Sequence, residues 1–580
     1  MRNVKIVCTL GPSTSGRDDI RGLVEAGMSV ARINASHGTA EERESLVENV
    51  KRVNDVTETP VAVMLDLQGP EIRTGETEEP VELESGATVE FVEGETITSD
   101  VIGLSRDISA VSPGDRVLLD DGRIESRVDS IEGEWVVATV ESGGLLKSHK
   151  GVNVPGVDLD MDVITEKDER DLAFAAEHEV DFVAASFVGS ASDVLSVSSV
   201  LESAGADIPI VSKIERADAI EHLDGIIRAS HGIMVARGDL GVELPMEDVP
   251  LIQKRIIRKS QNAGVPVITA TEMLESMIDS PRPTRAEASD VANAVLDGTD
   301  AVMLSAETAV GDHPSRVVSA MDRIIREVEI SEEYEEITEQ RVPAADEGAR
   351  TDPLARSARY LARDIDASAI VVASESGYTA RRVAKFRPQV PIVAATPQDT
   401  VSRQLGLVWG VDAQTADIQQ DDAMAVINRS VQAGIDSGLV DSGDTVVVLS
   451  GMMTELEGSD TTNTLKVHVA AETIAVGRAV VDGRVTGPVA RLTDGDLAGV
   501  EPGSIAVLGA EFDGEFEGDV AKLAGIVSAK SGMTSYAAMI AREIDVPMVS
   551  EAEIESVDDG DVITIDGERG IVYAGDTDQR

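Results

Sequence analysis

The sequence contains very little cysteine, lysine or aromatic residue. Among 580 residues there are 12 lysines and a single cysteine, Cys8, and aromatic residues make up 2%. One cysteine can neither close an intramolecular disulfide nor build a thiolate zinc site, so any metal must be bound by oxygen or nitrogen. No apolar run approaches the roughly 18 residues of a membrane-spanning helix, and Val4–Leu10 is typical of a strand rather than a leader. The composition predicts a cytoplasmic protein.

Acidic residues, in contrast, are abundant. Asp and Glu number 106 against 50 Lys and Arg, the formal net charge is −56, and the acids are spread along the whole chain. Such a charge repels nucleic acid and anionic membranes, and it destabilises the compact state unless counterions screen it. The Debye length falls to ~3 Å at 1 M salt, so this composition suits a salt-rich cytoplasm. We expect a halophilic protein without a nucleic-acid or membrane partner.

The first 310 residues alternate short apolar segments with longer helical patterns. This alternation predicts βα units, and eight of them predict an α/β fold with a (β/α)8 TIM barrel. The segments end in polar or charged residues, and the C-terminal rim of such a barrel is where active sites are built. The predicted strands are Lys5–Leu10, Val30–Asn34, Val61–Leu67, Phe182–Phe187, Ile210–Glu215, Ile233–Asp239, Val265–Glu272 and Ala301–Glu307.

An insertion interrupts the predicted barrel, which takes in residues 1–70 and 154–340. Residues 71–153 show short alternating segments separated by Gly and Pro turns, a pattern typical of a small β-rich domain. An insertion at the rim either closes over the site as a lid or is a passive decoration.

Two further regions follow the barrel. Residues 352–470 show a second α/β pattern, and residues 472–580 are rich in glycine and aspartate with one helix expected near Ser535–Glu543. We expect each region to form a domain of its own. The strands expected in the α/β region are Ala369–Ala373, Ile392–Ala395 and Thr445–Leu449.

Several stretches resemble the pyruvate kinase family. They occur in the family's order over about residues 1–470, and their length makes chance recurrence negligible. The resemblance implies transfer of the phosphoryl group of phosphoenolpyruvate to ADP, giving pyruvate and ATP in the last step of glycolysis, by an allosteric homotetramer. The stretches are Lys5–Ser13, Ala31–Gly38, Gly69–Gly75, Ser212–Glu215, Met234–Pro245, Thr269–Met277, Pro281–Val295, Ser450–Met453 and Thr461–Val467.

The predicted rim carries the charges that phosphoryl transfer needs, namely cations and a metal where oxygens gather negative charge. Lys213 stands two residues before Glu215, so both side chains point to the same face of a strand; a structural ion pair is the alternative. By resemblance, Lys213 stabilises the migrating phosphoryl group and the enolate, and it acts with Arg73 and Thr271 as the catalytic set. The resemblance places Mg²⁺ or Mn²⁺, which prefer oxygen ligands, on Glu215 and Asp239.

The resemblance also assigns the substrate contacts. Planar guanidinium groups suit bidentate phosphate recognition, and backbone amides at a helix start suit a carboxylate. The implied substrate-binding residues are Arg32, Lys213, Gly238, Asp239 and Thr271, with Arg73 as a second phosphate ligand. The implied nucleotide-binding residues are Asn34, His37, Arg73 and Lys150; for His37 a plain surface histidine is the alternative.

The family's monovalent ion, usually K⁺, is implied on Asn34, Ser36, Asp66 and the carbonyl of Leu67. The sequence mixes two subtypes: Glu71 matches members that require K⁺, whereas Leu67 matches members in which a lysine at the position of Glu71 replaces the ion. A negative Glu71 leaves a cation missing, so the charge favours K⁺ use.

The SESGYT stretch in the α/β region resembles the loop by which some members hold an effector phosphate. Hydroxyls and a glycine can hold phosphate with backbone amides. Glu375 and Tyr378 stand where basic residues would help, so a plain turn or another effector remains open. The candidate effector residues are Ser374, Ser376, Gly377 and Thr379.

The last region resembles the mobile phosphohistidine domain of phosphoenolpyruvate-utilising enzymes over Gly525–Pro547. The phosphorylated histidine of that pattern would fall at Tyr536, so we expect a structural or interface module. One rival interpretation is a synthase or dikinase-like enzyme, which needs the missing histidine. Another is a non-catalytic sensor, against which the intact Lys213, Glu215 and Asp239 argue.

Overall fold

A computed structural model describes residues 2–57, 59–157, 159, 161–346, 349–418, 423–450, 462–554 and 556–577. The chain divides into two compact units. The first contains Met1–Pro353, Ser376–Arg387 and Gln398–Ala413, and the second contains Leu354–Glu375, Pro388–Pro397 and Gln414–Arg580. In the described part of the chain, no helix combines the length and apolarity needed to cross a membrane.

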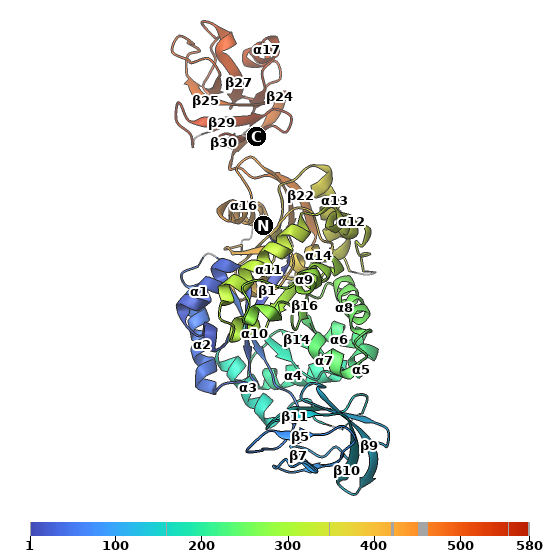
Figure 1. Ribbon diagram of the computed structural model, residues 1–580. Helices are drawn as coiled ribbons and strands as arrows, with labels where there is room; N and C mark the ends of the chain where they lie inside the picture. The colour runs from blue at the N-terminus through green and yellow to red at the C-terminus, as the bar shows by residue number, and fades with distance from the viewer. Residues whose placement is uncertain are drawn as a thin grey trace. The chain divides into compact units, whose positions relative to one another are not determined.

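Eight parallel strands close into a barrel in the first unit, in the order β1-β17-β16-β15-β14-β13-β3-β2 (Figure 1). Each strand coincides with a predicted segment to within a few residues at its ends, which confirms the (β/α)8 prediction. The strands are β1 (Lys5–Thr9), β2 (Val30–Asn34), β3 (Ala62–Asp66), β13 (Phe182–Ala185), β14 (Ile210–Ile214), β15 (Gly232–Ala236), β16 (Val267–Ala270) and β17 (Ala301–Leu304).

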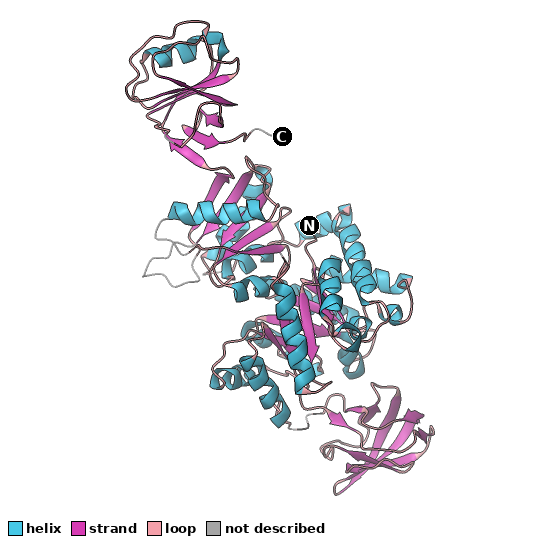
Figure 2. Cartoon of the chain, turned by 90° about the vertical axis from the view of Figure 1, so that its left-hand side faces the viewer, coloured by secondary structure: helices cyan, strands magenta, loops and turns pink. Residues whose placement is uncertain are grey.

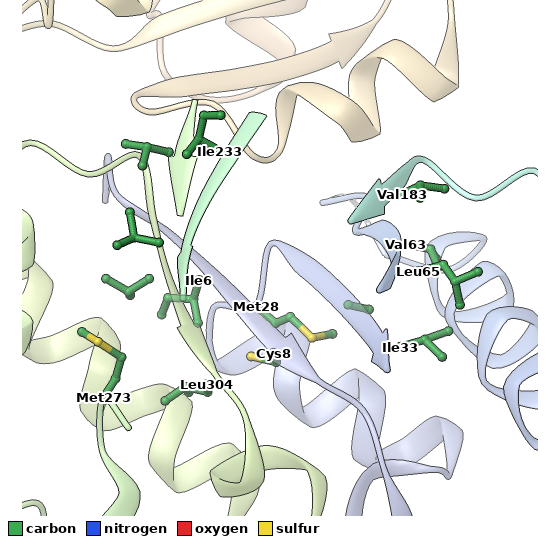
Figure 3. Packing of buried hydrophobic residues seen from close by; sticks show 14 of the residues in the cluster. Ile6, Cys8, Met28, Ile33, Val63, Leu65, Val183, Ile233, Met273 and Leu304 are labelled. Carbon is green, nitrogen blue, oxygen red and sulfur yellow. The ribbon is translucent and has the colours of Figure 1, made fainter. Parts of the chain in front are cut away.

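The barrel strands are apolar on both faces because both faces are buried. Val7 and Met64 belong to a cluster drawn almost entirely from strand residues, which fills the barrel interior. Ile6, Cys8 and Leu65 belong to a second cluster shared with the surrounding helices (Figure 3). Successive residues of one strand point to opposite faces, so neighbours in β1 enter different clusters. This arrangement explains the near-continuous apolar runs in the sequence.

Helices surround the barrel and begin at well-defined caps. In α2, α3 and α9 a threonine hydroxyl accepts a hydrogen bond from the third helical residue, whose carboxylate bonds back to the cap. The helices of this part are α1 (Arg17–Ala26), α2 (Ala40–Asn54), α3 (Glu166–Glu177), α4 (Ala191–Ser203), α5 (Ala217–Glu221), α6 (Leu223–Ala229), α7 (Arg237–Glu243), α8 (Val249–Ala263), α9 (Arg285–Asp297), α10 (Ala306–Ala309), α11 (Pro314–Glu329) and α12 (Glu332–Gln340).

The inserted segment from β4 to β12 contains strands and no helix among its described residues, as Figure 2 shows. Seven strands form a sheet in the order β4-β12-β8-β9-β10-β6-β7, and β5 pairs with β11. The segment has its own apolar core, which includes Phe91 and Val136. The strands are β4 (Ile72–Arg73), β5 (Val81–Leu83), β6 (Thr88–Glu93), β7 (Val101–Leu104), β8 (Arg116–Leu119), β9 (Ile124–Glu132), β10 (Trp135–Ser142), β11 (Gly144–Leu146) and β12 (Gly151–Asn153).

Residues 351–469 contribute a five-stranded sheet in the order β20-β19-β18-β21-β22. Three of its strands match predicted segments, whereas β20 and β22 were not predicted. Most of the Ser450–Met453 motif, and Thr461, lie outside the described residues. The elements are α13 (Thr351–Asp364), β18 (Ala369–Ala373), α14 (Tyr378–Lys385), β19 (Ile392–Thr396), α15 (Asp399–Leu405), β20 (Val411–Thr415), α16 (Ala423–Asp436), β21 (Thr445–Ser450) and β22 (Thr464–Val469).

The last part of the second unit is an eight-stranded sheet in the order β23-β30-β29-β25-β26-β27-β28-β24, with one α-helix in the predicted place. The elements are β23 (Thr473–Val476), β24 (Arg478–Val481), β25 (Arg484–Leu492), β26 (Ser504–Leu508), β27 (Leu523–Ser528), α17 (Tyr536–Glu543), β28 (Met548–Ser550), β29 (Val562–Asp566) and β30 (Ile571–Ala574).

Candidate active site

A cavity of about 210 Å³ lies where several barrel strands end. The carboxyl ends of parallel strands meet at one rim, so residues far apart in sequence converge there. The cavity brings together most of the predicted substrate, divalent-ion and potassium residues. Those that line it are Arg32, Asn34, Ser36, Leu67, Lys213, Glu215 and Asp239.

Lys213 occupies the centre of this charge cluster. Its Nζ lies 2.7 Å from Glu215 Oε1 and 3.4 Å from Asp66 Oδ1, and it donates a hydrogen bond to Ser186 Oγ at 2.8 Å. Burial lowers the pKa of Lys213, but attraction to Asp66, Glu215 and Asp239 outweighs burial and raises it above the usual range. The side chain therefore remains a cation inside a largely closed site.

Arg32 and Asp66 form a second buried pair. Arg32 Nε and Nη2 lie 2.6 and 2.5 Å from the same Asp66 oxygen, and Nη1 donates to Thr9 Oγ1 at 2.9 Å. Burial raises the pKa of Asp66, but Arg32 and Lys213 together outweigh burial and hold it below its ordinary value. Asp66 is therefore an ionised link between the two cations that an anionic substrate would meet.

The predicted potassium ligands lie around this pair. Asn34 Oδ1 accepts a hydrogen bond from the Ser36 amide at 3.0 Å, and the Leu67 carbonyl accepts one from Ser186 Oγ at 2.8 Å. Asn34, Ser36 and Leu67 line the cavity, whereas the carboxylate of Asp66 is held by Arg32 and Lys213.

Glu215 and Asp239 supply carboxylate oxygens to the same cavity. Glu215 Oε2 accepts a hydrogen bond from the Phe187 amide at 2.9 Å, which fixes its orientation. Burial, followed by repulsion from Glu215, raises the pKa of Asp239, and attraction to Lys213 offsets only part of that rise. Within the described residues, no three His, Cys, Asp or Glu side chains are grouped to hold a metal. A two-carboxylate set suits Mg²⁺, which keeps water and substrate oxygens as its other ligands.

The peptide after β16 has a strained conformation. Thr271 has a φ of 76°, which is unfavourable for a β-branched residue. Arg237 holds it by donating to the carbonyls of Ala270 and Thr271 at 3.0 and 2.7 Å. A Cβ added to Gly238 would lie 2.7 Å from Thr271 Cγ2, so this close approach requires glycine. The hydrogen bonds from Arg237 maintain this strained conformation and keep Thr271 against the start of α7.

Comparison with known families agrees with this geometry. Residues 1–318 match the family described as pyruvate kinase, barrel domain, and residues 352–468 match pyruvate kinase, alpha/beta domain. The chain belongs to the pyruvate kinase family. Pyruvate kinases of Geobacillus stearothermophilus, Bacillus licheniformis and Staphylococcus aureus (strain MRSA252) are 42%, 41% and 38% identical to it, with 99% of each chain covered. Residues 500–570 match the family described as PEP-utilising enzyme, mobile domain.

Three residues expected at the nucleotide of a pyruvate kinase lie apart from the cavity as far as the structure describes its walls. Arg73, in β4, has Nη2 2.5 Å from Glu71 Oε2, and Lys150 Nζ lies 2.6 Å from Asp120 Oδ1. His37 is exposed, with its backbone amide bonded to the Asn34 carbonyl at 3.3 Å. Arg73 and Lys150 must therefore exchange these carboxylate partners to bind a nucleotide phosphate.

The candidate effector residues lie around the start of α14. Ser374 follows β18 and is buried, as is Thr379 within the first turn of the helix. Gly377 is the N-terminal cap residue with a φ of 72°, and Ser376 Oγ accepts a weak hydrogen bond from the Tyr378 amide at 3.4 Å. A positive φ at the cap explains why this position is glycine.

The helix α17 begins at the position where the mobile-domain pattern has its histidine. Ser535 is the cap, and its hydroxyl accepts a hydrogen bond from the Ala538 amide at 3.2 Å. The Tyr536 ring lies 5.9 Å from the ring of Phe516, which lies 5.9 Å from that of Phe512. Tyr536 thus belongs to an aromatic cluster.

Sequence reasoning missed the partners of the predicted residues. Ser186 was noticed only as a polar strand end, and its role as hydrogen-bond partner of Lys213 required the strand order. Thr9, Arg216 and Glu243 were not identified, although the last two line the cavity. The strand-end position was the only sequence signal for Thr9.

Proposed function

We propose that this protein transfers the phosphoryl group of phosphoenolpyruvate to ADP and forms pyruvate and ATP, the last step of glycolysis. The observation that carries the proposal is the cluster of Lys213, Arg32, Glu215 and Asp239 that lines one cavity at the barrel rim. It combines two fixed cations with carboxylates for a hard metal ion, which is what phosphoryl transfer requires.

The reaction breaks the bond between phosphorus and the enol oxygen and forms one between phosphorus and a terminal oxygen of ADP. Lys213 is fully charged and fixed by Ser186, so its Nζ can stabilise negative charge on the migrating group and on the enolate oxygen. Asp66 holds the planar guanidinium of Arg32 through Nε and Nη2 and so orients it at the cavity, where a planar cation suits a phosphate. The enolate then takes a proton on carbon and becomes pyruvate.

Glu215 and Asp239 would hold the divalent ion, Mg²⁺ or Mn²⁺, because they are paired carboxylates beside Lys213. When bound, that ion adds positive charge near the phosphate oxygens. Oxygen donors of Asn34, Ser36, Asp66 and Leu67 would hold K⁺.

The remaining substrate contacts are those that the family resemblance implies. The amides of Gly238 and Asp239, with the Thr271 hydroxyl, would bind the carboxylate of phosphoenolpyruvate or pyruvate. Arg73, together with Asn34, His37 and Lys150, would bind the nucleotide once the lid pairs of Arg73 and Lys150 exchange.

Several finer features belong to the same proposal. The net charge of −56 supports a halophilic enzyme in a salt-rich cytoplasm. Family resemblance supports an allosteric homotetramer with a regulatory region at residues 352–470, a lid at residues 71–153 and a barrel in residues 1–70 and 154–340. Residues 472–580 would then be a separate mobile-like domain.

A coupled assay tests the proposal. Pyruvate formation from phosphoenolpyruvate and ADP is followed by its reduction with NADH, at multimolar KCl and at matched NaCl, with Mg²⁺ or with chelator, with and without sugar phosphates. We expect Mg²⁺-dependent activity that is higher in KCl. Absence of pyruvate formation in every condition, from protein with an intact melting transition, would contradict the proposed reaction.

A further inference from the structure

A second cavity, of about 390 Å³, adjoins the catalytic cavity in the first unit. Part of its wall comes from the segments that lead into and out of the lid, at Pro70, Ile72 and Val152–Val157. Another part comes from the chain after β14, beginning at Arg216. Glu243 lines both cavities. The second cavity, at the base of the lid, therefore shares wall residues with the catalytic cavity.

Glu243 is the last residue of α7, four residues after Asp239. This spacing places both carboxylates on the same face of the helix. Asp239 already has a place in the divalent-ion pair, whereas the mechanism above gives Glu243 no role. Glu243 is half-buried, and burial of a carboxylate costs free energy unless a hydrogen-bond donor or a positive charge compensates for it.

Three chain segments meet at the Glu243 carboxylate. Burial raises its pKa most strongly, and Asp218 adds to that rise, whereas Arg216 and hydrogen bonds with the backbone of Gly156 and Ala217 lower it. Gly156 belongs to the segment returning from the lid, and Ala217 begins α5. Gly156, Arg216, Ala217 and Glu243 also line one cavity, so Glu243 lies where the lid's return segment, the chain after β14 and α7 meet.

An ion pair stabilises the side of this contact that follows β14, and a turn forms the side that belongs to the lid's return segment. Arg216 Nε and Nη2 donate to the two oxygens of Asp218 at 3.1 and 2.9 Å, and Arg216 directly follows the divalent-ion residue Glu215. Gly156 has a φ of 77°, and a Cβ there would meet no atom within 4 Å. Backbone conformation, rather than lack of space, therefore explains glycine at this turn.

We propose that Glu243 is a positioning residue that couples the return segment of the lid to α7, so that Asp239 takes its working position when the lid segment is docked. The proposal rests on the proposed phosphoryl transfer. Glu243 lies between Gly156 and the helix that carries Asp239. Loss of its carboxylate would therefore let the lid segment and α7 move independently. A displacement of about 1 Å at a reacting group costs on the order of 100-fold in rate.

Kinetics of Glu243→Ala test this role. We expect kcat to fall about 10- to 100-fold, KM for phosphoenolpyruvate to change less than about threefold, and the Mg²⁺ concentration for half-maximal activity to rise about tenfold. Glu243→Gln keeps the length and one acceptor oxygen, so it should recover part of the lost kcat. The matched control is Glu221→Gln, which removes another carboxylate from the wall of the same cavity and should leave kcat within about twofold.

A fluorescence readout separates coupling from mere structural support. Trp135 lies on β10 of the lid and is 40% exposed, and the other tryptophan, Trp409, is buried. Phosphoenolpyruvate with Mg²⁺ should change Trp135 emission in the wild type, and Glu243→Ala should reduce that change. The part of the emission change that is lost in Trp135→Phe is the signal from the lid.

Two results would overturn the proposal. One is wild-type kcat and a full Trp135 response in Glu243→Ala. The other is a loss of activity that Glu243→Gln does not recover, with a lower melting temperature and an unchanged Trp135 response. The fluorescence response needs no turnover, so it tests the coupling even if the wild type forms no pyruvate, a result that would count against the proposed reaction alone.

Discussion

The barrel rim and the start of α17 both lie where family patterns place phosphoryl chemistry, yet they are built differently. At the rim, Lys213 is buried among two carboxylates and a hydroxyl. At the start of α17, Tyr536 packs with Phe516, and Arg542 of the same helix donates to the Met533 carbonyl at 2.6 Å. A phenol cannot act as the reversible N-phosphate carrier that an imidazole provides. We therefore expect the barrel to carry the chemistry and the last domain to be a structural or interface module.

Removing the central cation should have the largest effect. Lys213→Met should lower kcat by several orders of magnitude while the fold persists, because the lost charge acts mainly in the transition state. Steady-state assays with a thermal melt measure both properties. Lys530→Met is a matched control, since Lys530 is a surface lysine paired at 3.0 Å with the exposed Asp513. Near-full activity in Lys213→Met would contradict the assignment of phosphoryl transfer to the barrel rim.

Lowering the salt should have the next largest effect, and on both regions. At ~10 mM salt the Debye length grows to ~30 Å, so repulsion among the 106 acidic residues is no longer screened. We expect a loss of about 3 kcal/mol, or roughly 10 °C in Tm, relative to multimolar KCl. Melting in matched NaCl separates screening from specific K⁺ binding. A Tm that is independent of salt would contradict the halophilic interpretation.

Deleting residues 472–580 should have a smaller effect on catalysis. Each assigned catalytic and divalent-ion residue lies in the barrel or lid, so kcat should stay within about threefold, while stability, assembly or effector response changes. Incubation of the full chain with radiolabelled phosphoenolpyruvate without ADP should leave the last domain unlabelled. Stoichiometric, stable label on that domain would show that it does take part in phosphoryl transfer.

The smallest expected effect concerns His468 on β22. Burial, followed by repulsion from Lys466 and Arg569, lowers the pKa of His468 from 6.5 to about 4. Folding therefore favours the neutral ring: its contribution to stability is complete above pH 6.5 and is lost as the pH falls through about 4. We expect the stability of His468→Gln relative to the wild type, measured by urea unfolding, to be about 1 kcal/mol more favourable at pH 5 than at pH 7.5. An identical difference at both pH values would contradict the shift.

The sequence predicted the parts of the fold that depend on burial. Runs such as Phe182–Ala185 and Ala301–Leu304 are apolar because both faces of a barrel strand are covered, so their pattern identifies them. β24 and β20 contain only partly buried or exposed residues over most of their length, and such strands give little apolar signal. Their pairing comes from tertiary contacts.

The candidate site was predictable by residue type but not by partner. Lys213 and Glu215 follow from strand alternation and from the family resemblance. The link of Asp66 to both Arg32 and Lys213 depends on β2, β3 and β14 meeting at one rim, and so could not be derived from spacing along the chain.

The mutual pairing of Lys213 and Glu215 has a thermodynamic consequence. An anion that draws Lys213 Nζ from its 2.7 Å contact leaves a carboxylate without its counter-charge, and a cation bound to that carboxylate leaves the ammonium group without one. Each event makes the other more favourable, and linkage requires the enhancement to be equal in both directions. Phosphoenolpyruvate and the divalent ion should therefore bind with positive heterotropic cooperativity, so that either ligand alone binds weakly and the two together bind tightly.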